Sequence, residues 1–252
     1  MADNVLNVVL GLVASAISAG LGWLAQTLRR RRRVERVRRF FGLPTGSDCL
    51  IVVNRQPAST NAKSVSRTDV YALMELAALV KECGSRAELV AHDEVRQGLG
   101  SKAEFCIGGP ASNERTAAHL ASWLPGVAHL PTPDSVVPIL TIGSAEYPYV
   151  SGSGSSGGHS FALIARLQSA PDSRPAFLVS GLTATANQAG VRYLVAHHRE
   201  LARKYGQDGT FALVLRVVNP EAYGPDMVEL AADVTTEALH RPSAPAATTT
   251  AA

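Results

Sequence analysis

Short apolar runs alternate with amphipathic stretches from residue 49 onward, and this alternation constrains the fold more than any other feature of the chain. The first apolar runs are CLIVVN at 49–54, AELVAH at 87–92 and EFCIGG at 104–109. Stretches with helical spacing follow the first and the third of them. This order of strands and helices is typical of a parallel sheet with crossover helices. We therefore predict an α/β domain, a Rossmann-like three-layer sandwich.

The first helix is predicted from a capping signal and an apolar stripe. Ser66 and Asp69 have the S-x-x-D spacing of a capping box. Gly84 is a typical residue just beyond a helix end. The stripe expected to face the sheet consists of Val70, Leu73, Met74, Ala77 and Val80.

The second half of the domain has a less regular pattern. PILTIG at 138–143 and SFALIARL at 160–167 flank a Gly/Ser-rich loop, which predicts an antiparallel pair. AFLVSG at 176–181 leads into a long helix over about 185–205. Two closing strands are expected at 211–218 and 227–234. We therefore expect the second half of the sheet to be partly antiparallel. The apolar side of the long helix should consist of Val191, Leu194, Val195, His198 and Leu201.

An uncharged segment precedes the domain. Residues 5–28 contain no charge in 24 positions, and as a helix they would extend about 36 Å, enough to cross a bilayer core. Five arginines follow at once, which places the later chain in the cytoplasm. We predict one N-terminal transmembrane helix in the cell membrane, against the alternatives of a cleaved signal and a surface-lying helix. Small residues four apart, such as Gly11 and Ser15, would allow a homo-oligomer, although they are also common in any membrane helix.

The charge of the chain is concentrated in one segment. Residues 29–39 hold eight arginines and one glutamate, a local charge of +7. Because the whole chain carries +3, the remainder sums to −4. Next to a membrane, Arg29 to Arg39 would contact anionic lipid headgroups. This position makes nucleic acid an unlikely partner. The predicted organisation is a membrane helix (5–28), a polybasic segment (29–39), a cytoplasmic domain (40–240) and a disordered tail (241–252).

The stretch CIGGPASNERT, residues 106–116, is the main candidate for a ligand-binding loop. In open α/β sheets, ligands bind beyond the carboxyl ends of the strands, where helix N-termini present free N–H groups. Gly108 and Gly109 would let a ligand approach the backbone, and Ser112 or Asn113 would cap the helix. Arg115 in the first turn opposes the helix dipole, a cost that a bound anion would offset. The alternative is a tight turn with Arg115 solvated.

Polar residues after two other strands are expected at the same edge. Asn54 ends the first strand, while Thr183 and Asn187 follow the strand at 176–181. If the sheet is doubly wound, these loops converge on Gly108 to Asn113. A pocket of amides, hydroxyls and a guanidinium would suit a nucleotide or a sugar phosphate.

The Gly/Ser-rich loop at 151–160 matches two motifs without their structural context. It contains both G-x-G-x-x-G and G-x-S-x-G, but each of these motifs must open a helix, and this loop leads into a strand pattern. We interpret it as a hairpin connection. Its serines, Ser156 or Ser160, together with His159, are the residues that an enzymatic alternative would use.

Other chemistry has little support in the sequence. No P-loop, HExxH motif, carboxylate pair or CxxC occurs. His197 and His198 are adjacent on the predicted long helix and point in different directions, which disfavours a shared metal. Cys49, Cys83 and Cys106 do not form a disulfide framework. We expect no cofactor and no metal.

These observations lead to three functional hypotheses. The first is a membrane-anchored cytoplasmic domain that binds a small anionic ligand, a nucleotide or a sugar phosphate, as a sensor or regulatory module. The second is an enzyme of the hydrolase or glycosyl-transfer type that uses a loop serine and histidine. The third is a membrane-associated structural or assembly protein.

Overall fold

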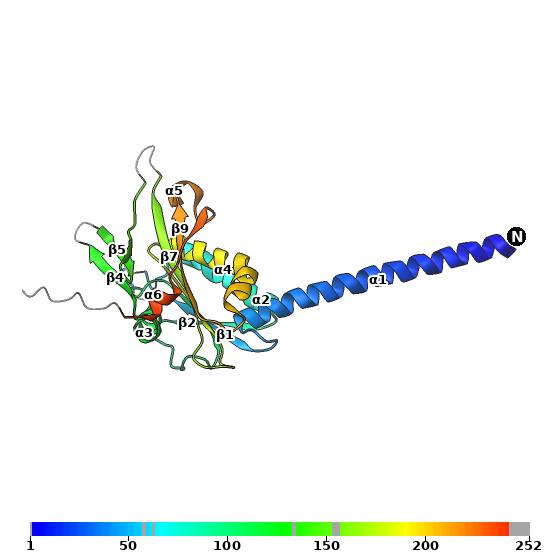
Figure 1. Cartoon of the computed structure of the whole chain (residues 1–252), viewed down its shortest axis with the longest axis horizontal. Coiled ribbons are helices and arrows are strands. Elements are labelled where there is room, and N and C mark those ends of the chain that lie inside the picture. Colours follow the sequence, from blue (N-terminus) through cyan, green and yellow to red (C-terminus); the bar gives the residue numbers. More distant parts are fainter. Residues whose placement is uncertain (1, 57–58, 62–63, 133–134, 153–156, 242–252) are drawn as a thin grey trace, which may run out of the picture.

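The protein is a mixed α/β structure preceded by one long helix (Figure 1). The computed structural model describes residues 2–56, 59–61, 64–132, 135–152 and 157–241. The helices are α1 (Ala2–Phe41), α2 (Arg67–Glu82), α3 (Glu114–Trp123), α4 (Ala184–Tyr205), α5 (Pro220–Tyr223) and α6 (Thr235–Leu239). The strands are β1 (Asp48–Val53), β2 (Arg86–Ala91), β3 (Ala103–Ile107), β4 (Val127–Thr132), β5 (Ser135–Ile142), β6 (Ala145–Tyr147), β7 (His159–Leu167), β8 (Ala176–Gly181), β9 (Phe211–Val218) and β10 (Val228–Asp233).

A seven-stranded sheet forms the centre of the described domain, in the order β10-β9-β7-β8-β3-β1-β2. The strands β2, β1, β3 and β8 run parallel. β7 is antiparallel to both β8 and β9, and β10 is antiparallel to β9. The α/β class and the partly antiparallel second half are therefore confirmed. The parallel strands place the carboxyl ends of β1, β3 and β8 at one edge of the sheet.

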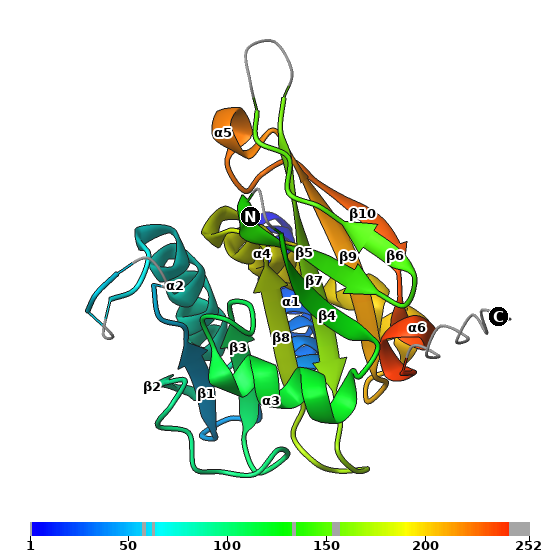
Figure 2. The same ribbon diagram turned by 90° about the vertical axis from the view of Figure 1, so that its left-hand side faces the viewer.

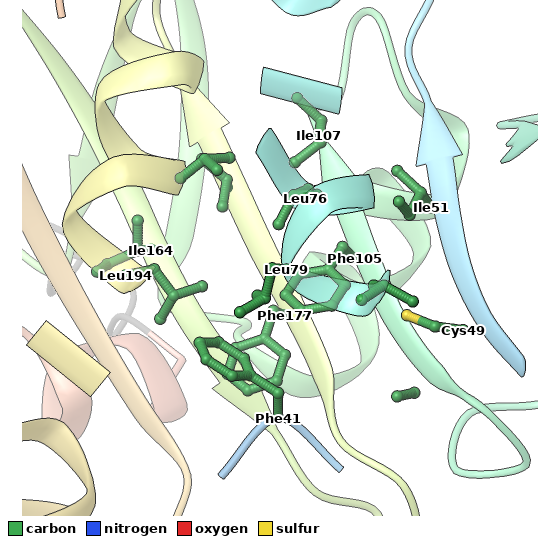
Figure 3. Close-up of a cluster of buried hydrophobic side chains, with 14 of the residues drawn as sticks. Phe41, Cys49, Ile51, Leu76, Leu79, Phe105, Ile107, Ile164, Phe177 and Leu194 are labelled. Atoms are coloured by element: carbon green, nitrogen blue, oxygen red, sulfur yellow. The ribbon is translucent and has the colours of Figure 1, made fainter. Parts of the chain in front are cut away.

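Helices and a small second sheet cover the two faces of the large sheet (Figure 2). On one face, α2, α4 and the end of α1 enclose a core that includes Phe105, Phe177 and Leu194 (Figure 3). On the other face, α3, α6 and the sheet β4-β5-β6 enclose a second core around Leu163 and Leu178. This arrangement has the three layers that the sequence predicts. Apolar side chains of the central strands, buried on both faces, hold the layers together.

The helix α1 is continuous from the apolar segment through the arginine run to the domain. It projects away from the domain (Figure 1), yet its last residues, Phe40 and Phe41, are buried in the core. The ring of Phe41 lies 5.3 Å from that of Phe177. The predicted segments 5–28 and 29–39 are thus parts of one helix, and the C-terminal end of this helix packs into the core of the domain. Within the described residues, none of the helices combines the length and apolarity required to cross a membrane.

The predicted pairing of residues 138–143 with 160–167 is wrong. The first segment belongs to β5, which pairs with β4 and β6 in the small sheet. The second is β7, which pairs with β8 and β9. β4 was not predicted, because VAHLPT has neither a continuous apolar run nor regular alternation. Its partner β5 therefore had no visible neighbour in the sequence.

The prediction for α2 is correct in position but wrong in detail. Met74 is 64% exposed and Val70 is 39% exposed, while Leu76 and Leu79 are buried. Ser66 makes no side-chain capping bond, so the predicted capping box does not form. The reason is that Asp69 is buried and faces the sheet, where two asparagines donate to it. Because Asp69 lies on the inner side of α2, Val70 and Met74 lie on its outer side.

Most of the remaining elements agree with the sequence prediction. On α4, Val191, Leu194, His198 and Leu201 are buried, and Val195 packs against them. His197 and His198 separate as expected: His197 stacks on Tyr193, whereas His198 lies against the ring of Phe40. The predicted tail, 241–252, lies outside the described residues except for Arg241.

Candidate ligand-binding site

A cavity of 380 Å³ lies at the carboxyl ends of β1, β3 and β8. It is bounded by the turn after β3, the turn after β8 and the strands β4 and β5 of the small sheet. Two segments that are far apart in the sequence, residues 109–112 and 181–182, both contribute to its lining. The described residues that line it are Gln56, Gly109, Pro110, Ala111, Ser112, His129, Val137, Pro138, Gly181 and Leu182.

The two glycines after β3 have different structural roles. Gly108 has a φ of +98°, and a Cβ there would lie 2.8 Å from the Cβ of Asn54. Glycine is therefore required at this position for backbone geometry and for close packing. Gly109 lines the cavity, and a Cβ on it would meet Ser180 Oγ at 3.5 Å and His129 Nε2 at 3.8 Å. The absence of a side chain at Gly109 thus leaves space that a larger residue would fill.

Two helix N-termini point to this edge of the sheet. Asn113 caps α3, because its side chain accepts a hydrogen bond from the Thr116 amide at 3.1 Å. Its Nδ2 also donates to the Ile107 carbonyl at 2.8 Å. Thr183 caps α4 by accepting from the Ala186 amide at 3.2 Å. The predicted cap at Asn113 is therefore present, while the Ser112 hydroxyl donates to the Gly109 carbonyl and stabilises the turn.

A buried carboxylate connects the loops around the cavity. Asp69 on α2 accepts hydrogen bonds from Asn54 Nδ2 at 2.9 Å and from Asn187 Nδ2 at 2.8 Å. Asn187 Oδ1 accepts a hydrogen bond from the backbone N–H of Gly181 at 2.7 Å. Asn54 and Asn187 therefore converge as predicted, but they bind Asp69 rather than lining the cavity. Asp69 has no signal in the sequence for this role, because its S-x-x-D spacing indicates a capping box instead.

Arg115 does not reach the cavity. Its Nε and Nη2 donate to the two carboxylate oxygens of Glu104, at 2.7 and 2.8 Å. Burial would raise the pKa of Glu104, but hydrogen bonds from Arg115, His119 and Cys106 outweigh burial and hold it at about 2. Arg115 is thus neutralised by a buried carboxylate. This pair explains how a cation can occupy the first turn of α3 without a bound anion.

Glu104, Cys106 and His119 are close enough to consider as metal ligands, since their donor atoms lie within 4.8 Å of one another. Glu104 Oε1 already accepts from His119 at 2.9 Å and from Cys106 at 3.0 Å. Burial and the Glu104 charge raise the pKa of Cys106 well above its usual value, so the thiol stays protonated. A metal ion would have to displace Arg115 and this proton. We interpret the cluster as a closed hydrogen-bond network.

His129 and Ser180 are the site residues that sequence reasoning missed. His129 Nε2 lies 3.2 Å from Ser180 Oγ, and its Nδ1 is buried without a described partner. Burial lowers the pKa of His129 to about 4, so the ring is neutral at pH 7. A lone histidine in an unrecognised strand carries no motif. His129 becomes part of the site because β4 packs near the turn after β3, where its Nε2 would lie 3.8 Å from a Cβ on Gly109.

The loop serines and His159 do not form a catalytic arrangement in the described residues. Ser160 is fully buried, and its hydroxyl lies 3.3 Å from that of Thr183. His159 precedes it on β7, so the two side chains point to opposite faces of the strand. Ser156 lies outside the described residues.

The cavity lining indicates what kind of ligand could fit. Its described side chains are mainly apolar or uncharged, and none is ionised at pH 7. The polar groups are Gln56, Ser112 and His129. Comparison with known proteins gives no further guidance, because no family model, curated protein or solved structure matches the chain.

Proposed function

We propose that this protein binds a small organic ligand in the 380 Å³ cavity and acts as a sensor or regulatory module. The observation that carries the proposal is the position of the cavity. It lies beyond the carboxyl ends of parallel strands, where α/β sheets bind their ligands. Its size and its mainly apolar lining with a few polar groups are typical of small-molecule sites.

The predicted ligand class is a nucleotide or a sugar phosphate. Pro110, Val137 and Leu182 supply apolar surface for a ring, while the side chains of Gln56 and His129 supply hydrogen-bonding groups. A phosphate would depend on the amides and dipoles at the N-termini of α3 and α4, because Arg115 is occupied by Glu104. The ring should therefore contribute more to affinity than the phosphate does.

A thermal-shift screen of the full chain tests this proposal. The panel consists of purine and pyrimidine nucleotides, the matching nucleosides and common sugar phosphates. A ligand at 100 times its Kd adds about 2.7 kcal/mol of stability, which corresponds to roughly 5–10 °C in a domain of this size. Similar shifts for a nucleotide and its nucleoside would support ring recognition. No shift with any compound would contradict the proposal.

A second candidate function is hydrolysis, which the Ser180 and His129 pair favours. A neutral imidazole 3.2 Å from a hydroxyl has the arrangement of a general base and a nucleophile. Ser180 is fully buried, so a substrate would need to enter over Gly109. This alternative predicts turnover of p-nitrophenyl esters that disappears in both Ser180→Ala and His129→Gln. The binding proposal predicts no turnover.

We also propose that α1 attaches the domain to a membrane, with the domain on the cytoplasmic side. The support is the row of apolar side chains that the protein itself leaves uncovered, including Ile17 at 58%, Leu21 at 62% and Trp23 at 69% exposure. The arginine run follows directly. Vesicle flotation tests attachment, and replacing Ile17 and Leu21 by glutamate should abolish it. Equal flotation of that variant would contradict the proposal.

The same uncovered side chains would also serve an assembly role through homo-oligomers of α1. Analytical ultracentrifugation in detergent distinguishes this alternative. Assembly through α1 predicts an oligomer that Gly11→Leu with Ser15→Leu disrupts, while attachment alone predicts a monomer in both proteins.

A further inference from the structure

A second cavity, of 280 Å³, lies at the opposite edge of the large sheet. It is enclosed by the last turns of α1, the end of β7 and the loop that precedes β8. Four arginines contribute to its lining: Arg38, Arg39, Arg166 and Arg174. The other described lining residues are Glu35, Gly42, Pro44, Gln168, Asp172, Ser173, Pro175 and Asp208.

Arg166 is the unusual member of this group because its side chain is only 1% exposed. Its guanidinium lies 5.6 Å from the ring centroid of Phe40 and 5.8 Å from that of Phe177. Nη1 donates to the Gly209 carbonyl at 3.1 Å and Nη2 to Gln168 at 3.2 Å. Both acceptors are neutral, and Nε is buried without a described partner.

The charge of Arg166 is poorly compensated by the described residues. The nearest carboxylate is that of Asp208, at 3.9 Å, and this side chain is 76% exposed. Burial lowers the pKa of Arg166 to about 10, against the smaller effect of Asp208, so the group remains charged at pH 7. A buried cation without a close counterion is costly for a fold to maintain.

Two further arginines at the cavity are available to a ligand. Arg39 and Arg174 form no ion pair with any described residue, whereas Arg38 donates to the Cys83 carbonyl at 2.7 Å and lies 3.6 Å from Glu35. The carboxylates of Glu35, Asp172 and Asp208 also line the cavity. They belong to exposed residues, where water and salt screen their charges, while Arg166 lies in a low-dielectric region.

We propose that this cavity binds a phosphate group, held by Arg166 together with Arg39 and Arg174. A guanidinium is planar and offers paired N–H donors that match phosphate oxygens. The group would belong either to a lipid headgroup or to a soluble phosphorylated molecule. Arg38 and Arg39 are the last residues of the polybasic segment, so the site includes the end of that segment. This site is separate from the carboxyl-edge cavity and does not depend on the function proposed there.

The test compares charge-matched variants of the full chain. Arg39→Gln with Arg174→Gln removes two exposed or half-buried donors and leaves the buried Arg166 in place, so that folding is preserved. The control is Arg203→Gln with Arg199→Gln, two exposed arginines of α4 that do not line the cavity. Each protein is titrated calorimetrically with inorganic phosphate and with pyrophosphate. A titration with sodium chloride at the same ionic strength is the reference.

The proposal predicts binding to the wild type and a loss of about tenfold or more in the cavity variant, since a hydrogen bond to a charged group is worth about one to two decades in affinity. The control variant should change by less than about twofold, because exposed charges away from the site contribute little. Equal binding by the two variants would overturn the proposal, as would a wild type that binds neither phosphate nor pyrophosphate.

Vesicle sedimentation then identifies the source of the phosphate. Vesicles of phosphatidylcholine with or without phosphatidic acid are used, and both variants have the same net charge. Weaker sedimentation of the cavity variant alone, with competition by pyrophosphate, assigns the site to a lipid headgroup. Equal sedimentation of the variants, with pyrophosphate binding still different, assigns it to a soluble phosphorylated molecule.

Discussion

The two edges of the large sheet differ in how they use charge. Near the carboxyl-edge cavity, Asp69 pairs with two asparagines. Arg115, at the start of α3, pairs with Glu104 near the start of β3 and away from this cavity. The described cavity lining itself is uncharged at neutral pH. At the amino edge, where the parallel strands begin, four arginines line the second cavity. Among the described residues, the carboxylate nearest the buried Arg166 is that of Asp208, at 3.9 Å. The comparison shows that a cation near a helix N-terminus need not mark an anion site.

The difference arises from the depth at which each arginine meets an acid. Arg115 reaches a carboxylate that is 2% exposed, at hydrogen-bond distance, so its charge is satisfied inside the fold. Within the described part of the chain, the carboxylate that Arg166 meets is the exposed one of Asp208, at 3.9 Å. Salt weakens the second interaction far more than the first. We therefore expect the arginines at the amino edge to bind a phosphate group more tightly than Arg115 could.

The largest predicted effect is the loss of stability in Arg115→Ala, which tests whether Arg115 has a structural role or a role in ligand binding. Arg115→Ala leaves Glu104 buried without its cationic partner, and we expect a loss of about 3–5 kcal/mol in the free energy of unfolding, measured by urea denaturation. Binding to the folded fraction should not change. If the variant were fully stable but lost ligand affinity, Arg115 would belong to the carboxyl-edge site and the comparison would fail.

The next effect concerns pH. The folded-state pKa of His129 is about 4, below its unfolded value of about 6.5, so the fold favours the neutral ring. As the pH falls from about 6.5 to about 4, the unfolded chain takes up a proton that the folded chain does not, and up to about 3 kcal/mol of stability is lost.

His159 and His198 also have lowered pKa values because of burial, so the contribution of His129 is measured as a difference. Stability curves of wild type and His129→Gln should differ in slope between about pH 4 and 6.5 and run parallel above this range. Parallel curves throughout would show that His129 is solvated and the carboxyl edge more open than described.

A smaller effect tests the helix caps. Asn113→Ala removes the cap of α3 and a bond to the Ile107 carbonyl, which should cost about 1–2 kcal/mol. Ser66→Ala at the start of α2 should cost less than about 0.5 kcal/mol, because Ser66 makes no capping bond. Chemical denaturation of both variants measures the difference. Equal losses of stability in the two variants would instead support the capping box that the sequence predicts at Ser66.

The smallest predicted effect is a difference in how salt changes ligand affinity at the two edges of the sheet. Between about 0.05 and 0.5 M sodium chloride, pyrophosphate binding at the amino edge should weaken several-fold because arginine charges are screened. Binding of a nucleoside at the carboxyl edge should change by less than about twofold. Calorimetric titrations at both salt concentrations measure this contrast, and an equal salt dependence would remove it.

The sequence predicted the large sheet better than the site. Strands such as AFLVSG and FALVLRVV are continuous apolar runs, and the structure gives them the expected bounds. The turns that follow β3 and β8 were also located correctly, since glycines after a strand and a capping residue are local signals. β4 has no such signal. Its pairing with β5, and the part of the cavity lining that these two strands supply, therefore cannot be predicted from the sequence.

Contacts between distant residues account for the remaining errors. Asn54, Asp69 and Asn187 meet only because β1, α2 and α4 converge, and no spacing along the chain reveals this. The same is true of Arg115, whose partner Glu104 precedes it on the neighbouring strand. Residue types indicated polar loops correctly. Their hydrogen-bond partners decide which side chains face a ligand, and these depend on the tertiary fold.

The most direct test of the account fills the carboxyl-edge cavity. Gly109→Val adds a side chain to the cavity lining, and its Cβ would be in ordinary contact with Ser180, His129 and the Gly181 carbonyl. Gly98→Ala is a control with open space around the added Cβ. Each protein is titrated calorimetrically with the panel compound that shifts the wild-type melting temperature most. We predict that binding is weakened at least about tenfold in Gly109→Val and unchanged in Gly98→Ala. Equal affinity in all three proteins would place the ligand elsewhere and contradict the account.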